Sequence, residues 1–273
     1  MPSIPIALTI AGSDSGGGAG IQADLKTFQR FGVYGTSVIT AVTAQNTQGV
    51  RAVQPMSLTM VEAQLAAVAE DLPPGAVKSG MLATGELVAA TARAVTGYGW
   101  TPYVLDPVMV ATSGDRLLDR DAEALIRDRL VPLAALVTPN LEEAALLTGL
   151  TVTDPAGMAR AGRRLLELGA GAALVKGGHL GGEEITDVLV TASGDRPFVH
   201  RKITTTSTHG TGCTLSAAIT AGLARRADGQ RGGLAVRESD LGEIVAEALA
   251  YVQRAIATAP GLGHGHGPVN HLA

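Results

Sequence analysis

Short apolar runs alternate along the chain with longer segments in which apolar residues recur at helical spacing. At the start of the chain, the apolar run at 4–10 has the length and composition of a buried strand. After a glycine-rich stretch, Ile21, Leu25 and Phe28 recur at helical spacing until Gly32 can end the helix. The alternation continues with predicted strands at 36–43, 76–78, 103–105, 135–137, 172–175, 185–190 and 198–203.

Helices are predicted between these strands, and two of them have clear start signals. Thr59 and Glu62 have the spacing of a capping box, and Asp154 precedes Pro155, which suits the first helical position. The regular alternation predicts an α/β fold, a three-layer α/β/α sandwich in which helices cover both faces of a mostly parallel sheet. The further helices are predicted at 59–68, 86–95, 122–130, 142–147, 155–168, 215–224 and 244–257.

The composition narrows the class of protein. The 273 residues are 46% hydrophobic and 17% charged, so the chain can bury a large core, and we expect one domain over residues 1–273. The formal net charge of −4, without a basic cluster, argues against nucleic acid and anionic membranes as partners. The single cysteine excludes an internal disulfide, and no apolar run approaches the ~18 residues of a membrane span. We therefore expect a cytoplasmic protein.

The residues that follow the predicted strands are the first candidates for a site, because ligands bind beyond the carboxyl ends of the strands in such sheets. Gln45 and Asn46 offer donors and acceptors to a flat heterocycle. The polar segment 111–115 is either a lid or a plain connection. The complete set of these positions is 12–20, Gln45 with Asn46, 79–81, 106–115, Pro139 with Asn140, and 176–179.

The first glycine-rich turn, 12–20, lies where many nucleotide sites have a phosphate cradle. It is not a P-loop, because Gly18 stands where that motif requires lysine and Ala19 where it requires Ser or Thr. A dinucleotide site is equally disfavoured, since no carboxylate occurs between Asp24 and Glu62 to hold a ribose. Two interpretations remain, a close backbone approach to a small ligand or a simple tight turn. Asp24, on the border of the helix's apolar stripe, faces either that pocket or solvent.

A second glycine motif precedes the predicted helix at 215–224. Gly210, Thr211 and Gly212 can form a nest of N–H groups at the helix N-terminus, which suits the negative charge of a transferred phosphoryl group. An ordinary glycine-rich helix start is the alternative. Cys213 is either a small core residue or a general base, and the helix dipole is expected to lower the pKa of its thiol.

Three polar positions at other strand ends suit a nucleotide and its metal. Asn140 and Glu143 form a simple capping box, or place a carboxylate that organises Mg²⁺ through water. Asp106 is a second candidate for the metal. Lys176, followed by Gly177 and Gly178, offers a cation to a nucleotide or snorkels out of the sheet.

Histidines near the C-terminus suggest metal only weakly. His264, His266 and His271 have no cysteine or carboxylate cluster beside them. We interpret this segment as a tail and predict no zinc site.

Together these motifs closely resemble the bacterial hydroxymethylpyrimidine/phosphomethylpyrimidine kinase family of thiamine biosynthesis, across essentially the whole chain. Each motif is weak alone, but their joint order and spacing are specific. They are Ala11-Gly-Ser-Asp-Ser-Gly-Gly-Gly-Ala-Gly20, Thr43-Ala-Gln-Asn46, Asp106-Pro-Val-Met109, Thr138-Pro-Asn140, Lys176-Gly-Gly-His179, His209-Gly-Thr-Gly-Cys213 and Gly263-His-Gly-His-Gly-Pro268.

The resemblance implies a ribokinase-like fold, a homodimer, and transfer of the γ-phosphoryl group of ATP to a hydroxymethyl group. It also assigns roles by position. The anion hole falls on Gly210 to Cys213, although most of the superfamily has Asp at the position of Cys213. Thr112 stands where the family commonly has a lid lysine. The pyrimidine falls to Gln45, Gly12, Val42, Val108 and Met81, and the superfamily's Asn-x-x-Glu metal motif to Asn140 and Glu143. The positions singled out above add Asp24 as a further pyrimidine candidate, Lys176, Gly178 and Asn140 for the nucleotide, and Asp106 beside Glu143 for Mg²⁺.

The resulting hypothesis is a kinase that phosphorylates 4-amino-5-hydroxymethyl-2-methylpyrimidine with MgATP and then phosphorylates the monophosphate to the diphosphate. A pyridoxal kinase is the enzymatic alternative, because pyridoxal is a ring of similar shape with a hydroxymethyl group. A pyrimidine sensor without turnover is the alternative from another class.

Overall fold

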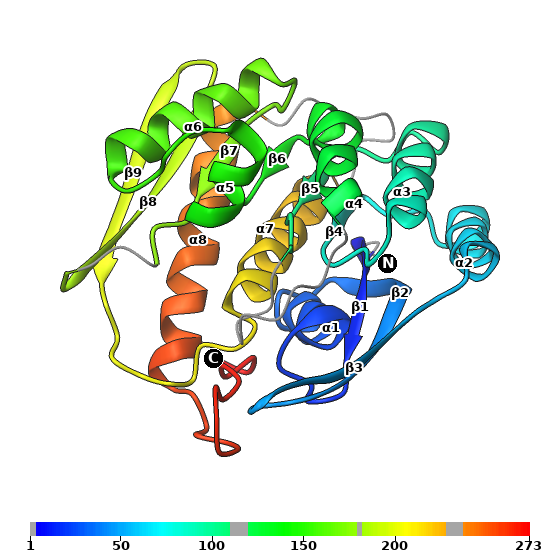
Figure 1. Cartoon of the computed structure of the whole chain (residues 1–273), viewed down its shortest axis with the longest axis horizontal. Coiled ribbons are helices and arrows are strands. Elements are labelled where there is room, and N and C mark those ends of the chain that lie inside the picture. Colours follow the sequence, from blue (N-terminus) through cyan, green and yellow to red (C-terminus); the bar gives the residue numbers. More distant parts are fainter. Residues whose placement is uncertain (1–3, 110–119, 179–181, 228–236) are drawn as a thin grey trace.

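The structure is a computed structural model that describes residues 4–109, 120–178, 182–227 and 237–273 (Figure 1). The candidate lid at 111–115 and His179 lie outside these residues. The described strands form one sheet in the order β3-β2-β1-β4-β5-β6-β7-β8-β9. Their bounds are β1 Ile6–Asp14, β2 Tyr34–Asn46, β3 Gly49–Pro55, β4 Ala76–Ser79, β5 Tyr103–Leu105, β6 Leu136–Val137, β7 Ala173–Val175, β8 Glu184–Thr191 and β9 Gly194–Arg201.

The central strands, from β2 to β7, are parallel, and only the pairs at the two edges are antiparallel. Helices lie on both faces of the sheet (Figure 1). The predicted α/β/α sandwich with a mostly parallel sheet is therefore confirmed. The helices are α1 Gly20–Arg30, α2 Leu58–Asp71, α3 Gly85–Gly97, α4 Arg120–Leu125, α5 Leu141–Thr148, α6 Pro155–Glu167, α7 Thr211–Ala227 and α8 Glu238–Ala257, with short helical turns at η1 Ile126–Leu130 and η2 Val131–Leu133.

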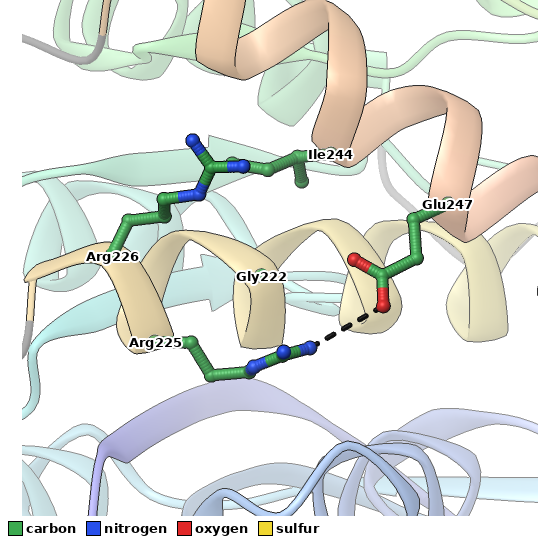
Figure 2. A pocket seen from close by; sticks show the side chains of 5 residues that line it. All are labelled: Gly222, Arg225, Arg226, Ile244 and Glu247. Carbon is green, nitrogen blue, oxygen red and sulfur yellow. Dashed lines mark hydrogen bonds and ion pairs between the residues drawn. The ribbon is translucent and has the colours of Figure 1, made fainter.

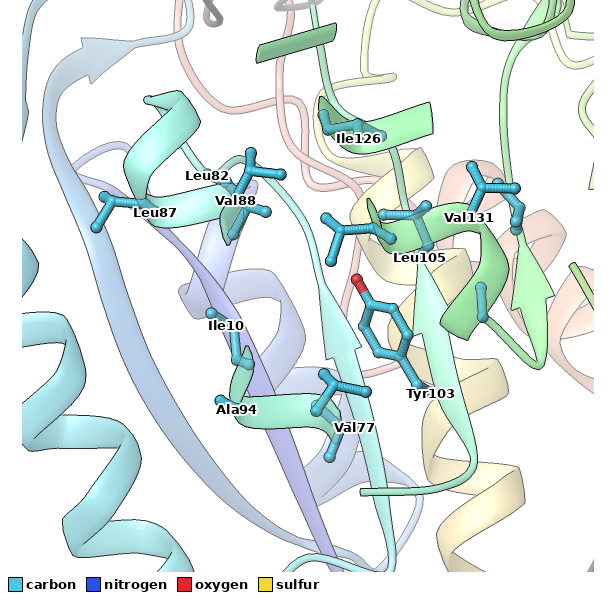
Figure 3. Close-up of a cluster of buried hydrophobic side chains, with 14 of the residues drawn as sticks. Ile10, Val77, Leu82, Leu87, Val88, Ala94, Tyr103, Leu105, Ile126 and Val131 are labelled. Atoms are coloured by element: carbon cyan, nitrogen blue, oxygen red, sulfur yellow. The ribbon is translucent and has the colours of Figure 1, made fainter. Parts of the chain in front are cut away.

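The two largest cores among the described residues lie on opposite faces of the sheet, because successive residues of a strand point to opposite faces. In β5, Tyr103 and Leu105 enter one core, which α2, α3 and η1 cover (Figure 3). Val104, between them, enters the other core, which α1, α7 and α8 cover. The apolar strands at the centre of the sheet are thus buried on both sides, which is why they read as short continuous apolar runs.

Three predicted features differ from the structure. The edge strand β3 was not predicted, because its side chains are mostly exposed and leave no apolar pattern. The capping box at Thr59 is wrong, since Ser57 caps α2 and accepts the N–H of Met60 at 3.3 Å. The helix predicted at 122–130 is α4 followed by the wider turn η1.

No helix among the described residues is both long and apolar enough to span a membrane.

Candidate active site

The first glycine turn joins β1 to α1 and is organised by Asp14, the last residue of β1. One carboxylate oxygen, Oδ1, accepts the N–H of Gly16 at 2.7 Å. The other, Oδ2, accepts the N–H groups of Gly18 and Ala19 at 3.1 and 2.9 Å. A phosphate bound in this turn would need the same N–H groups. The chain's own carboxylate occupies them, so the turn is not a phosphate cradle.

The second glycine turn precedes α7 and packs directly against the first. Gly210 has a φ of +81°, and a Cβ there would overlap the carbonyl oxygen of Gly18. A Cβ on Gly18 would in turn lie 2.6 Å from Cδ2 of His209. The imidazole Nε2 of His209 lies 2.8 Å from Oδ2 of Asp14. Glycine is therefore required at both positions for the two turns to meet.

Cys213 lies in the first turn of α7, where the prediction of a lowered pKa is wrong. Burial raises the pKa of the thiol to about 12, although the residue keeps some exposure. The positive charge of Lys78 opposes this effect, but the carboxylates of Asp24 and Asp106 reinforce it. Desolvation thus outweighs the helix dipole, and the group at neutral pH is a thiol.

Asp106 and Lys176 bring opposite charges to this turn from the ends of β5 and β7, the strands on either side of β6. Lys176 Nζ lies 3.2 Å from Oδ1 of Asp106, and it would lie 3.2 Å from a Cβ on Gly212. Oδ2 of Asp106 accepts the hydroxyl of Ser216, on α7, at 3.0 Å. Burial raises the pKa of Asp106, but the two lysines Lys176 and Lys78 outweigh it and hold that pKa below its usual range. The ammonium group of Lys176 is therefore fixed beside the second glycine turn.

The capping box predicted at the start of α5 is present. Asn140 Oδ1 accepts the N–H of Glu143 at 2.9 Å, and Glu143 Oε2 accepts the N–H of Asn140 at 2.8 Å. Glu143 is only 5% exposed. Burial raises its pKa to about 7, and the negative charge of Asp106 adds to this effect, while Lys176 opposes it. The two carboxylates therefore repel each other across the site.

A hydrated divalent cation fits this arrangement, because it would offset the repulsion between the two carboxylates. Magnesium is commonly held by one or two carboxylates, with waters and substrate phosphates completing its shell. Among the described residues, no group of three or more His, Cys, Asp or Glu side chains is placed to hold a metal by itself. Glu143 and Asp106 therefore suit a cation that substrate phosphates help to bind.

Apart from Asp24, the predicted pyrimidine residues lie toward the carboxyl ends of β1, β2, β4 and β5. Met81 is nearly buried and packs with Ala41 and Val108 in a small apolar cluster. A Cβ on Gly12 would lie 3.3 Å from the sulfur of Met81, so Gly12 belongs to the same wall. Val42, next to Ala41 on β2, is 47% exposed.

Gln45, near the end of β2, is fixed by the first glycine turn. Its backbone N–H donates to the Ser15 hydroxyl at 2.8 Å, and its carbonyl accepts from that hydroxyl at 2.7 Å. Its side-chain Nε2 lies 3.5 Å from Nε2 of His209. The amide is thus held beside the junction of the two glycine turns.

Asp24 does not face an open pocket, which corrects the sequence interpretation. Its side chain is fully buried and accepts from Lys78 Nζ at 2.8 Å and from the Thr9 hydroxyl at 2.6 Å. The border of the apolar stripe is enclosed because α1 packs against both the sheet and α7. Gly178, by contrast, has open space around its Cα.

Comparison with known proteins decides the family. The profile described as phosphomethylpyrimidine kinase matches residues 14–270. A hydroxymethylpyrimidine/phosphomethylpyrimidine kinase from Rhizobium meliloti is 52% identical over 270 residues, which are 98% of this chain and 97% of that protein. The chain belongs to the phosphomethylpyrimidine kinase family.

Solved structures of kinases share the fold of this family member. A phosphomethylpyrimidine kinase from Clostridium difficile has a TM-score of 0.79 and 42% identity, with 93% of this chain and all of that chain covered. An ADP complex of Bacillus subtilis pyridoxal kinase has a TM-score of 0.88 and 35% identity, with 98% of both chains covered. These matches confirm the ribokinase-like fold that the motifs imply.

A separate pocket lies away from these residues. Figure 2 shows it between α7 and α8, lined by Gly222, Arg225, Arg226, Ile244 and Glu247. Gly222 is eleven residues beyond Thr211 on α7, which places the pocket about 16 Å along the helix from the glycine turn. It is therefore not part of the kinase site.

Sequence reasoning about this phosphomethylpyrimidine kinase family member missed Asp14, Lys78 and His209. Asp14 stood inside the glycine motif, two residues before Gly16, which is the spacing of a side chain that caps a turn. Lys78 was hidden in a strand predicted from its apolar neighbours. His209 carried no signal of its own, because its partner is far away in the sequence.

Proposed function

We propose that the protein transfers the γ-phosphoryl group of ATP to the hydroxymethyl oxygen of 4-amino-5-hydroxymethyl-2-methylpyrimidine. It then phosphorylates the monophosphate to the diphosphate. The observation that carries this proposal is the N-terminal turn of α7, where Gly210 and Gly212 free the backbone and Lys176 Nζ lies beside Gly212. Family membership over nearly the whole chain supports the same reaction.

The wall formed by Gly12, Met81 and Val108 gives the pyrimidine an apolar face. Gln45 offers its amide to the edge of the ring, and Val42 extends the wall with an exposed side chain. A ring held there lies beside the second glycine turn, because His209 connects Gln45 to Gly210. Asp24 is not proposed as a ligand contact, because its side chain is fully buried in an ion pair with Lys78.

Lys176, Asn140 and Gly178 are the proposed nucleotide residues, and Glu143 with Asp106 are the proposed Mg²⁺ residues. Bound Mg²⁺ would neutralise charge on the nucleotide phosphates. Asp106 is already held by Lys176 and Ser216, so its part is to fix Lys176 and to act on the cation through water. Glu143 accepts backbone N–H groups of Asn140 and Met109, which fix the direction of its carboxylate.

Transfer of this kind depends mainly on positioning and charge stabilisation. The N–H of Thr211 donates to the carbonyl of Thr208 at 3.3 Å, so the N–H groups of Gly210, Gly212 and Cys213 are the ones proposed to stabilise the negative charge that develops on the phosphoryl oxygens. A thiol with a pKa of about 12 stays protonated in the ligand-free site, so Cys213 is a hydrogen-bond donor there and the glycine turn carries the stabilisation. In the second transfer the attacking atom is a phosphate oxygen of the monophosphate, which is already anionic and needs no base. Cys213→Ala should therefore slow the first transfer more than the second.

The pyridoxal kinase alternative remains because the Bacillus subtilis enzyme has the higher TM-score of the two structures compared. ADP release with each substrate distinguishes the two activities, and we expect the pyrimidine to give the higher kcat/KM. Failure to release ADP with either pyrimidine would overturn the proposal. A pyrimidine sensor would bind the pyrimidine but release no ADP, whereas the kinase releases ADP, and its Cys213→Ala variant should bind the pyrimidine normally and release ADP more slowly.

We also propose that the protein acts as a cytoplasmic homodimer. The support is membership of the phosphomethylpyrimidine kinase family over nearly the whole chain, since the resemblance to that family implies a homodimer. Light scattering of the purified protein should give twice the chain mass of 27.7 kDa.

A further inference from the structure

The segment after α8 returns to the site, although its sequence resembles a tail. The backbone N–H of His266 donates to the carbonyl oxygen of Thr47 at 2.7 Å. The N–H groups of His264 and Gly265 both donate to the Thr47 hydroxyl, at 3.1 and 3.3 Å. Thr47 follows β2 and lies two residues after Gln45. One end of the segment is thus tied to the pyrimidine side of the site.

The alternating glycines of this segment are explained by its close approach to Thr47. Gly263 has a φ of +83°, and a Cβ there would collide with the Thr47 side chain. A Cβ on Gly265 would collide with the Thr47 carbonyl group. Only glycine lets the two backbones come this close. The motif of Gly263, His264, Gly265 and His266 is therefore a packing motif around one threonine.

The other end of the segment is tied to the second glycine turn. The N–H of His209 donates to the carbonyl of Gly267 at 3.0 Å, and His209 pairs with Pro268 in a parallel bridge. His271 is 6% exposed, and its Nε2 lies 3.2 Å from the hydroxyl of Thr214, which directly follows Cys213. Burial lowers the pKa of His271 to about 4, with Lys26 and His209 adding to the effect, so this imidazole is neutral.

We propose that residues 263–271 form a C-terminal clamp that sets the distance between the pyrimidine wall and the anion turn. Its residues are positioning residues and do not touch the reacting atoms. The clamp spans from Thr47, beside Gln45, to Thr214, beside Cys213, and Figure 1 shows this red segment near the start of α7. A displacement of about 1 Å between reacting groups can cost as much as a hundredfold in rate. The inference rests on the proposed function.

Thr47→Val tests the clamp, because it keeps the shape of the side chain and removes the hydroxyl that accepts two N–H groups. We expect the pyrimidine KM to rise about fivefold and kcat to fall by a similar factor, with the KM for ATP unchanged. Thr47→Ser keeps the hydroxyl and should restore both values to within about twofold. Thr191→Val is the matched control, since Thr191 is half-buried at the end of β8, where its hydroxyl donates to the carbonyl of Gly194, and the change should leave all three values unchanged.

Hydrogen exchange supplies a readout that does not depend on activity. If the clamp couples the two turns, Thr47→Val raises exchange at 210–214 as well as at 46–49 and 263–266. Increased exchange at the last two segments alone, with unchanged KM and kcat, would overturn the clamp and leave the proposed function intact. If Thr47→Val does not fold, His271→Asn is measured in the same two ways, and the clamp then requires increased exchange at 46–49. A wild-type protein without pyrimidine kinase activity would overturn the proposed function, and the exchange result would still decide the clamp.

Discussion

His209 Nε2 lies 2.8 Å from Oδ2 of Asp14, and this contact joins the two glycine turns across 195 residues of sequence. The same carboxylate takes three backbone N–H groups of the first turn, so it occupies the place that an anion would take there. The second turn is left as the anion site. One buried aspartate therefore decides which of the two glycine turns can bind an anion.

Asp14→Asn should lower the free energy of unfolding by about 1–3 kcal/mol, because an amide presents N–H groups to donors that need an acceptor. Burial raises the pKa of Asp14, but hydrogen bonds from His209 and from the N–H groups of Ala19 and Gly16 outweigh it and hold that pKa below its usual range. Its stabilising effect is therefore present above about pH 4 and is lost as the pH falls further. Urea denaturation at pH 7 and at pH 3 measures both effects.

Asp195→Asn is the matched control for that experiment, because Asp195 pairs with Arg163 at the surface. Loss of this surface ion pair should lower the free energy of unfolding by no more than about 1 kcal/mol. Equal effects of the two substitutions at pH 7 would show that Asp14 does not organise the turn.

The thiol of Cys213 should react slowly with iodoacetamide. The thiolate is the reactive form, and a pKa of about 12 leaves about one molecule in ten thousand ionised at pH 8. Since the chain has one cysteine, total labelling reports this site alone. We expect the rate to keep rising up to pH 10 in the ligand-free protein. A plateau below pH 9 would mean that the helix N-terminus and Lys78 outweigh burial.

The buried pair of Lys78 and Asp24 should be costly to break. Burial lowers the pKa of Lys78, but nearby negative charges, Asp24 first, outweigh this and raise it. Asp24→Asn leaves that charge without its partner and should cost about 3–5 kcal/mol of unfolding free energy. The double variant Asp24→Asn with Lys78→Met removes both charges and should recover most of the loss. Calorimetry or urea denaturation of the wild type, the single variant and the double variant measures the free energy of unfolding. A double variant as unstable as Asp24→Asn would contradict this account.

Glu143→Gln separates the carboxylate from the capping box. A glutamine oxygen can still accept the N–H of Asn140, so the melting temperature should stay close to that of the wild type. Loss of the negative charge should lower kcat about tenfold or more and raise the Mg²⁺ concentration needed for half-maximal rate. Glu142→Gln, on the exposed side of α5, is the control and should change neither value. A normal Mg²⁺ dependence in Glu143→Gln would remove Glu143 from the metal site.

The sequence predicted those parts of the molecule that follow from local periodicity and from strand ends. The central strands and most helices could be found because they are apolar on a helical or strand period, as Tyr103–Leu105 illustrates. The capping box at Asn140 was equally local. The strand β3 escaped because its exposed residues have no such pattern. The pKa of Cys213 was mispredicted because it depends on burial and on the charges of Lys78, Asp24 and Asp106. These residues come from β4, from α1 and from the end of β5, and only the fold brings them together.

The site residues divide in the same way. Gly210 and Gln45 were identified from motifs in consecutive sequence, whereas Asp24 was misplaced because the packing of α7 against α1 cannot be read from the helix alone. His209 and the C-terminal clamp make contacts between segments more than 190 residues apart. Their motifs could be read from the sequence, but the partners of those motifs could not.

Identification of the products formed from MgATP and 4-amino-5-hydroxymethyl-2-methylpyrimidine tests the central claim most directly. Mass spectrometry over time should show the monophosphate appear first and the diphosphate follow, with one ADP released for each transfer. A reaction that stops at the monophosphate would contradict the second step. No phosphorylated pyrimidine at all, or phosphorylation of pyridoxal alone, would contradict the account as a whole.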